Sequence, residues 1–440
     1  MIAEDWKRHE IAPQVRLWGT VTGSDGSTVS VAGLARLAGL GDMVEIETGV
    51  APLSGEVIAI DAAELRVLLL SAPVGLRTGQ KAWIKRHATA RPRKAWLGHV
   101  IDAFGHPSDG ADLPEDDAFP DMDRTISADQ RRPLGMRLAT GLAALDTFLP
   151  LCRGQRLGVF AGSGVGKSRL MSDLALGVSA DVVVIGLIGE RTREVGDFVR
   201  LLREAGGLER AVIIAATSDQ SALIKRRAAN LTLATAEHFR DHGRQVLCLF
   251  DSVTRFAEAH REIALAAGEP PALRAFPPST TSAIAKLCER AGTGFEGTDA
   301  GDITAIFTVL VSGSDMEEPV SDMVRGILDG HVVLDRAIAE RGRFPAIDLR
   351  RSVSRSAPDA WSEDEGNLVA AARRLVALYE ESAPMIQAGL YQPGADPALD
   401  EAVRLWPLLD QFTGTQMRGR SDLESFALLE RIIAGEPAPA

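Results

Sequence analysis

Ala161-Gly-Ser-Gly-Val-Gly-Lys-Ser168 lies between a strand-like run, residues 155–160, and a stretch with helical periodicity, residues 169–176. A strand, a glycine-rich loop and a helix in this order are the context of a phosphate-binding loop, or P-loop. Glycines leave backbone N–H groups free to converge on phosphate oxygens, and the following helix turns its positive end toward the same anion. The sequence therefore predicts a nucleotide site made by Gly162, Ser163, Gly164, Val165, Gly166, Lys167 and Ser168.

Two residues of this loop have predicted chemical roles. Lys167 is expected to reach the β- and γ-phosphates of a nucleotide, and the Ser168 hydroxyl is expected to bind Mg²⁺. The loop opens with Ala161, whereas the usual motif opens with glycine, so only the looser form of the pattern is matched. For the loop taken alone, the alternative is a glycine-rich turn from strand to helix with a solvated lysine.

Composition restricts the class of protein. The 440 residues are 45% hydrophobic and 25% charged, which is ordinary for a soluble globular protein of two or three domains. The formal net charge of −12 does not favour wholesale nucleic-acid binding. The apolar runs are too short to span a bilayer, and the first residues lack the apolar core of a signal peptide. Because Cys152, Cys248 and Cys288 form no CxxC pair, we expect a cytoplasmic protein without a disulfide framework or zinc site.

The residues before the P-loop are predicted to form a short segment and a small domain. Residues 1–12 are the short N-terminal segment, with Trp6 and Ile11 as its apolar residues. Residues 13–88 contain strand-like runs separated by Asp-Gly and similar turns, which predicts a small antiparallel β-barrel with strands near 15–21, 28–31, 43–47, 55–60 and 64–70.

The predicted barrel has an even charge balance. Residues 1–90 carry nine Lys and Arg against ten Asp and Glu, and Trp18 and Trp83 are the only aromatic residues of the barrel sequence. RNA-binding barrels stack bases on aromatic side chains above a basic groove. RNA binding is therefore disfavoured, and a role in assembly is the preferred interpretation.

The rest of the chain is predicted to be an α/β domain followed by helices. Residues 89–360, which begin with a connector, alternate strands with helices, as in a mainly parallel sheet covered on both faces. Residues 361–440 have apolar residues at helical spacing, and they carry thirteen Asp and Glu against six Arg. A solvated face and a partner-docking surface both remain open as interpretations of that acidity. The expected sheet strands are 156–160, 181–187, 211–216, 245–250, 303–311 and 331–334.

Two carboxylates follow predicted strands of this sheet. Asp251 follows the apolar run 245–250, and Glu190 follows the run 181–187. Since the carboxyl ends of parallel strands face one crevice, both acids are expected near the P-loop. We expect Asp251 to hold Mg²⁺ through a water and Glu190 to polarise the attacking water. An N-cap of the next helix is the alternative for Asp251.

Two arginines are candidates for contact with the transferred phosphoryl group. Arg191 follows Glu190 and is expected to touch the γ-phosphate. Arg355 lies in a cluster of arginines after the last predicted strand. If that segment reaches a neighbouring subunit, Arg355 acts in trans as an arginine finger. Composition alone does not distinguish it from Arg350 or Arg351.

Six ordered motifs resemble the ATPases of type III protein export, and most closely the flagellar export ATPases, which are related to the catalytic subunits of rotary ATP synthases. The resemblance extends over nearly the whole chain, and the family's form of the P-loop accommodates Ala161. The motifs are the P-loop, G-E-R-T-R-E at 189–194, D-S-V-T-R-F at 251–256, G-E-P-P at 268–271, I-L-D-G-H at 327–331 and S-V-S-R at 352–355.

The resemblance implies a fold and an assembly. The expected fold is α/β: a RecA-like P-loop ATPase domain with an N-terminal small β-barrel and a C-terminal helical domain. The expected working form is a homohexamer with ATP sites between subunits. By match to the family's motifs, Lys167, Ser168 and Asp251 take the nucleotide and magnesium positions, Glu190 is the catalytic glutamate, and Arg355 is the finger.

The resemblance also points to two residues near the adenine of ATP. Phe344 matches an aromatic position beside the adenine at which the family often has tyrosine. Stacking is expected to survive with phenylalanine, without the contact of a hydroxyl group. Tyr391 is a second candidate near that pocket, with a place in the core of the helical domain as the alternative.

Partners are implied by the resemblance as well. The stiff loop 268–280 contains Pro270, Pro271, Pro277 and Pro278, and it is expected to face the channel of the hexamer and meet a coiled-coil stalk protein. A plain surface loop is the alternative. The N-terminal segment, short for the family, is expected to bind a stator-like regulator. Export substrates and chaperones are expected at the C-terminal domain, and the contact with the membrane export gate is expected to be indirect.

The predicted function is hydrolysis of ATP that energises flagellar-type protein export, peripheral to the membrane export apparatus. The ATPase of a virulence injectisome shares all of these motifs and is the first alternative. An RNA-translocating hexameric helicase or terminator is an alternative of another class, which the aromatic-poor barrel disfavours. A non-catalytic subunit of a mixed rotary ring is a third, disfavoured because one chain carries Lys167, Glu190 and Arg355.

Overall fold

A computed structural model describes residues 17–85, 90–114, 128–311, 316–416 and 421–435. The chain separates into two compact units. The first contains residues 1–89, 220–224 and 258–279, and the second contains residues 90–219, 225–257 and 280–440. The predicted N-terminal segment with Trp6 and Ile11 lies outside the described residues.

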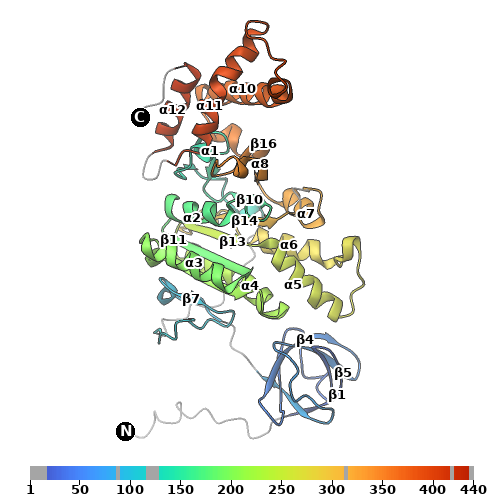
Figure 1. Ribbon diagram of the computed structural model, residues 1–440. Helices are drawn as coiled ribbons and strands as arrows, with labels where there is room; N and C mark the ends of the chain where they lie inside the picture. The colour runs from blue at the N-terminus through green and yellow to red at the C-terminus, as the bar shows by residue number, and fades with distance from the viewer. Residues whose placement is uncertain (1–16, 86–89, 115–127, 312–315, 417–420, 436–440) are drawn as a thin grey trace, which may run out of the picture. The chain divides into compact units, whose positions relative to one another are not determined.

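A closed antiparallel barrel forms most of the first unit, with the strand order β1-β2-β5-β4-β3-β6 (Figure 1). Its interior is filled by aliphatic side chains such as Val31, Ile46 and Val67, which are fully buried. The barrel is closed by pairing of Gly19 on β1 with Ala82 on β6. Its strands are β1 (Gly19–Asp25), β2 (Thr28–Ala32), β3 (Met43–Ile46), β4 (Leu53–Ile60), β5 (Glu64–Leu69) and β6 (Lys81–Lys85).

The predicted barrel is confirmed, but one of its strands escaped prediction. The sequence of β6 is Lys81-Ala-Trp-Ile-Lys85, and of these residues only Ala82 is fully buried. A five-residue strand with lysine at both ends has too weak an alternation to be recognised by itself. Its place is fixed by pairing with β1 and β3.

An eight-stranded sheet lies at the centre of the second unit, within the described residues, in the order β16-β15-β10-β14-β13-β11-β12-β7. All neighbouring pairs are parallel except β15 and β16. A ribbon of β8 (Arg137–Leu138) and β9 (Leu151–Cys152) stands apart from it. The strands of the sheet are β7 (Val100–Ile101), β10 (Arg156–Ala161), β11 (Val182–Glu190), β12 (Ala211–Thr217), β13 (Val246–Asp251), β14 (Ile303–Leu310), β15 (Gly330–Leu334) and β16 (Ile347–Ser354).

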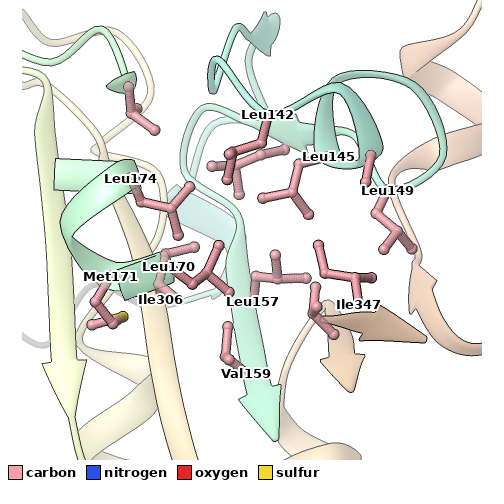
Figure 2. Packing of buried hydrophobic residues seen from close by; sticks show 14 of the residues in the cluster. Leu142, Leu145, Leu149, Leu157, Val159, Leu170, Met171, Leu174, Ile306 and Ile347 are labelled. Carbon is pink, nitrogen blue, oxygen red and sulfur yellow. The ribbon is translucent and has the colours of Figure 1, made fainter. Parts of the chain in front are cut away.

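Helices pack on both faces of this sheet. On one face, Leu157 and Val159 of β10 belong to the same buried cluster as Leu170 and Leu174 of the following helix, as Figure 2 shows. On the other face, a Cβ added at Gly186 would lie 2.6 Å from Thr232 Oγ1. The helices of the chain are α1 (Ala143–Thr147), α2 (Lys167–Gly177), α3 (Thr192–Glu204), α4 (Ala222–Asp241), α5 (Val253–Ala266), α6 (Ser279–Glu289), α7 (Pro319–Ile327), α8 (Arg336–Glu340), α9 (Ala357–Ala360), α10 (Glu363–Gln387), α11 (Pro397–Thr413) and α12 (Asp422–Ile433).

Helices α10, α11 and α12 contribute to the same hydrophobic core as the strands of the sheet. Leu405 and Leu429 belong to the same buried cluster as Leu145 of α1. The start of α10 is fixed by a capping box, in which Ser362 and Glu365 each bind the other's backbone N–H. The predicted boundary between residues 360 and 361 remains a prediction, because the sheet and these helices form one compact unit.

The arginine-rich segment before Arg355 corrects one expectation. The sequence places residues 350–354 after the last strand, but they belong to β16, the antiparallel edge strand of the sheet. The inward positions near the end of β16 are filled by Ser352 and Ser354, which are buried. The first half of β16 has buried Ile347 and Leu349, but its second half has serine at the buried positions, so the apolar alternation does not continue to Arg355.

Candidate active site

The P-loop connects β10 to α2, as its sequence predicts. Gly164 and Gly166 have φ values of +77° and +91°, a backbone region in which an L side chain is strained. A Cβ added at Gly164 would have no heavy atom within 4 Å, so the loop is open on that side. The N–H of Leu170 donates to the Gly166 carbonyl at 3.0 Å and begins the helix. An open loop of left-handed glycines before a helix of eleven residues suits a phosphate chain.

Lys167, Glu190 and Asp251 come together beside this loop. The Nζ atom of Lys167 lies 2.8 Å from Glu190 Oε1 and 2.5 Å from Asp251 Oδ1. The two acids end β11 and β13, which are neighbours in the sheet. Thr308 on β14 donates its hydroxyl to Asp251 Oδ1 at 2.6 Å. Chain segments that are far apart in the sequence therefore meet at the carboxyl ends of the parallel strands.

The electrostatics of this cluster have two opposed causes. Burial alone would lower the pKa of Lys167, but the charges of Asp251 and Glu190 outweigh it and raise that pKa. Burial raises the pKa of Asp251, and the nearby Lys167 opposes the increase. Lys167 therefore stays protonated at neutral pH, and Asp251 depends on a neighbouring cation for its charge.

The carboxylate of Asp251 faces Lys167 and Thr308, and a different residue serves the following helix. The Ser252 hydroxyl accepts the N–H of Arg255 at 3.4 Å near the start of α5. The Asp251 carboxylate accepts hydrogen bonds from two side chains of the site. The geometry thus agrees with the interpretation of Asp251 as a site residue over the N-cap alternative.

The residues present fit a magnesium ion. Mg²⁺ is usually held by one or two protein oxygens together with substrate phosphates and water. Within the residues that the structure describes, no group of three or more His, Cys, Asp and Glu gathers as a closed metal cage. Ser168 in the first turn of α2 and the buried Asp251 carboxylate are oxygen donors of the kind that Mg²⁺ prefers.

Phe344 lies against the P-loop from the α8–β16 connection. A Cβ added at Gly166 would be 2.9 Å from Phe344 Cδ1, so the ring covers this glycine closely. The guanidinium group of Arg169 lies 5.7 Å from the centre of the same ring. The structure thus brings Phe344 to the P-loop, and its place beside the adenine remains a prediction.

Tyr391 lies in the connection between α10 and α11. Its hydroxyl donates to Asp400 Oδ1 at 2.5 Å, and this hydrogen bond raises the pKa of Tyr391. This hydrogen bond lies within the helical part of the chain. Its place beside the adenine remains a prediction.

The two candidate arginines lie elsewhere. The side chain of Arg191, just before α3, is 81% exposed and lies 3.4 Å from Glu194. Arg355 is exposed and directly follows β16. Gly330 at the start of β15 pairs with Ser354, whereas Leu334 at its end pairs with Ala161 of β10. Arg355 is therefore at the amino ends of the parallel strands, opposite to the P-loop of its own chain.

A cavity of about 780 Å³ opens beside the first turn of α2. The amide of Gln416 donates to Asp173 at 2.9 Å at its wall. Four carboxylates line this cavity, and their negative charge makes it unsuited to binding phosphate groups. It is lined by Ser168, Arg169, Ser172, Asp173, Leu176, Glu194, Asp197, Phe198, Leu201, Glu204, Ala205 and Gln416.

Sequence reasoning missed two contributors to the site. Thr308 lies inside a mostly apolar strand and belongs to no motif, so only the register of β14 beside β13 reveals its bond to Asp251. Arg169 follows the P-loop directly, but its position above Phe344 depends on the chain between α8 and β16. Its place after Ser168 was the one available signal.

The fold and this site define a P-loop ATPase with a RecA-like domain. Residues 141–354 match the family model of the ATP synthase alpha/beta family nucleotide-binding domain, and residues 361–429 match the T3SS EscN ATPase C-terminal domain. The flagellum-specific ATP synthase of Caulobacter vibrioides is 47% identical over 431 residues, 96% of either chain. This chain belongs to the family of the flagellum-specific ATP synthases and type III export ATPases, and it is an ATP hydrolase.

Other similar proteins agree with this family. The flagellum-specific ATP synthase of Salmonella typhimurium is 38% identical, covering 94% of this chain and 93% of that protein. The SPI-2 type 3 secretion system ATPase of the same species is 43% identical, with 80% and 81% covered. The assembled ATPase EscN of enteropathogenic E. coli superposes with a TM-score of 0.84 at 35% identity, covering 94% of this chain and 100% of that one. The predicted family, fold class and type III export function are thus confirmed.

In the part of the chain that the structure describes, no helix is both long enough and apolar enough to cross a membrane.

Proposed function

We propose that this chain hydrolyses Mg²⁺-ATP as a homohexamer and energises flagellar-type protein export at the membrane export apparatus. The observation that carries the proposal is that the candidate residues lie at opposite ends of the strands of one sheet. Lys167, Glu190 and Asp251 gather at the carboxyl ends of the strands, and Arg355 is exposed at the amino ends. A complete site then needs a second copy of the chain. In support, the similar ATPase EscN has been solved in an assembled form.

The chain's own residues divide the work of binding. The N–H groups of residues 162–168 surround the phosphates. Lys167 is held in place by two carboxylates, and it can exchange these hydrogen bonds for ones to phosphate oxygens. Ser168 and Asp251 would hold Mg²⁺, Asp251 through a water. When bound, Mg²⁺ neutralises charge on the β- and γ-phosphates. Phe344 offers a ring face beside Gly166 for adenine, and Tyr391 is the second candidate there.

Hydrolysis requires a group that orients water and a positive charge on the γ-phosphate. Glu190, at the end of β11, is partly buried, accepts a hydrogen bond from Lys167 at 2.8 Å, and is the candidate base. Arg191 follows it and, being exposed, is free to reach the γ-phosphate when a nucleotide is bound. Arg355 of the adjacent subunit supplies the finger, an interaction generally worth about 10³–10⁵ in rate.

The stalk protein is the partner with the most direct support. EscN has also been solved in complex with its central stalk EscO, and this chain matches that structure with a TM-score of 0.80. In the loop 268–279, Glu269 accepts the N–H of Ser279 at 2.8 Å, and the Arg261 guanidinium lies 4.9 Å from the centre of the Phe276 ring. A loop held in this way presents its exposed Pro270 and Pro271 as a stiff surface for a coiled coil.

The remaining partners follow from the family. Export substrates and chaperones would use the acidic helical region after residue 360, and a stator-like regulator would bind the N-terminal residues. Contact with the membrane export gate would be indirect. Flagellar export is preferred to a virulence injectisome because the flagellum-specific relative of Caulobacter vibrioides is 47% identical over 96% of the chain. Expression of this chain in a strain that has lost swimming through deletion of its own flagellar export ATPase checks this choice. Restored swimming supports it, and no restoration despite normal expression contradicts it.

The measurement that tests the proposal is specific ATPase activity across a wide range of protein concentration, with assembly followed in parallel. Activity per subunit that increases steeply with assembly is expected, because each site takes Arg355 from a neighbour. Mixing Arg355→Ala protein with Lys167→Ala protein should restore part of the turnover, since some sites then have an intact loop and an intact finger. Concentration-independent activity, or no recovery in confirmed mixed assemblies, contradicts the shared site.

A further inference from the structure

A buried polar network surrounds the backbone at Arg355. Gln155 is fully buried, and its Nε2 donates to Ser354 Oγ at 3.0 Å. The Ser354 hydroxyl donates to the Pro150 carbonyl at 2.7 Å and lies 3.0 Å from Ser356 Oγ. Both serines, which flank Arg355, are only 6% exposed. Buried groups with this many partners are fixed in position, because each lost bond leaves a desolvated polar atom.

Asp329 holds Arg355 from the neighbouring strand end. The N–H of Arg355 donates to the Asp329 carbonyl at 3.0 Å. The Asp329 carboxylate in turn accepts the backbone N–H of Arg156 at 2.9 Å and its guanidinium at 3.1 and 3.2 Å. A bidentate pair of this type fixes orientation as well as distance. The backbone of Arg355 is therefore tied to the first residue of β10.

The side chain of Arg355 contrasts with this fixed backbone. It is exposed, and its Nη2 atom lies 3.4 Å from the Arg325 carbonyl, a long contact. A fixed backbone with an exposed guanidinium, held by one long contact, suits a group that must reach outside its own chain. The P-loop begins at Ala161, the last residue of β10, and the Arg355 backbone is tied through Asp329 to the first residue of the same strand. One strand of six residues therefore connects the P-loop with the segment that holds Arg355.

We propose that Gln155, Ser354 and Asp329 are positioning residues that fix the direction in which the Arg355 side chain extends toward the site of the adjacent subunit. This inference rests on the proposed action of Arg355 in trans. The three residues touch no nucleotide of their own site, because they lie at the opposite ends of the strands from the P-loop. Their effect is on the geometry of the arginine, and small misplacements of a reacting group cost on the order of 10²-fold in rate.

The test uses the full-length hexamer with Ser354→Ala, and Ser352→Ala as the matched control. Ser352 is also a buried hydroxyl of β16, and it accepts the N–H of Val333 at 2.9 Å, away from the network at Arg355. Ser354→Ala is expected to lower kcat about tenfold with KM for ATP unchanged, whereas Ser352→Ala keeps kcat within about twofold. Unchanged kcat in assembled Ser354→Ala protein overturns the inference.

A double variant separates positioning from general damage. In Arg355→Ala/Ser354→Ala protein, kcat is expected to equal that of Arg355→Ala alone, because a positioning residue has no effect once its arginine is gone. If the kcat of the double variant instead falls by the product of the two single-variant losses, the inference is overturned. If Ser354→Ala fails to assemble, Asp329→Asn and Gln155→Leu are measured in the same pair with Arg355→Ala, and the same two outcomes decide.

The mixing experiment distinguishes this inference from the proposed function. Ser354→Ala subunits have intact P-loops, so Lys167→Ala subunits should raise their turnover by supplying well-placed arginines. If Arg355→Ala protein itself is fully active, the trans role fails and the inference fails with it. If Arg355→Ala is rescued in mixtures but Ser354→Ala is not, only the positioning role is wrong.

Discussion

The ammonium group of Lys167 lies 2.5 Å from Oδ1 of Asp251, a carboxylate that is almost fully buried. Loss of the cation leaves the Asp251 carboxylate with the hydrogen bond from the Thr308 hydroxyl. A site built in this way is sensitive to the lysine before any nucleotide arrives, because burial of an unpaired charge is unfavourable.

We expect Lys167→Ala to abolish measurable ATP turnover and to raise the pKa of Asp251 further, since burial is then unopposed by the lysine. Nucleotide binding should fall by at least tenfold, because the contact with the β- and γ-phosphates is lost. Fluorescent-nucleotide titration and steady-state turnover measure both effects. Lys286→Ala, which removes an exposed lysine of α6, is the control and should behave like the wild type. Turnover above a tenth of the wild-type rate would contradict the role of Lys167.

Glu190→Gln should keep nucleotide binding and stop hydrolysis. The amide retains the size of Glu190 and its hydrogen bond to Lys167, but it cannot accept a proton or polarise water as a carboxylate does. A loss of about 10²–10⁴-fold in kcat is expected, with the nucleotide affinity changed by less than about threefold. Glu340→Gln, an exposed carboxylate paired with Arg336, provides the comparison. Full activity of Glu190→Gln protein would remove Glu190 from the catalytic residues.

Two glycines of the P-loop offer a matched pair that tests the contact with Phe344. Both Gly164 and Gly166 have positive φ, so alanine at either position costs about 1–2 kcal/mol in backbone strain. Only at Gly166 does the new Cβ also meet the Phe344 ring, at 2.9 Å. We therefore expect Gly166→Ala to raise KM for ATP several-fold more than Gly164→Ala. Equal KM values in the two variants would show that the ring has no part in nucleotide binding.

The sequence alone predicted the residues that a local motif identifies. The P-loop, Glu190 and Asp251 each follow a recognisable strand, and the rule that parallel strands end at one edge places them together. Thr308 was missed because its bond to Asp251 depends on the register between β13 and β14. The location of Arg355 opposite to its own P-loop depends on the antiparallel direction of β16, whose second half has serine in place of apolar residues at its buried positions.

Stability should fall as the pH decreases from about 6.5 to about 4, and His238 on α4 is one cause. Burial and the nearby His242 lower the pKa of His238 from 6.5 to about 4. The unfolded chain therefore takes up this proton at a higher pH than the folded chain does. Since protons then favour the unfolded state, the free energy of unfolding decreases as the pH falls through this window.

Urea denaturation of the wild type and of His238→Gln at pH 7 and pH 5 measures the contribution of His238. His238 is only partly shielded from solvent, so we expect about 1–2 kcal/mol less loss in the variant over this range. His99→Gln is the control, because His99 is paired with Asp109 at 3.0 Å in a different part of the unit. If the free energy of unfolding falls by the same amount in the wild type and in His238→Gln between the two pH values, His238 is protonated to the same extent in the folded and the unfolded chain. The acid sensitivity then has its origin in other groups.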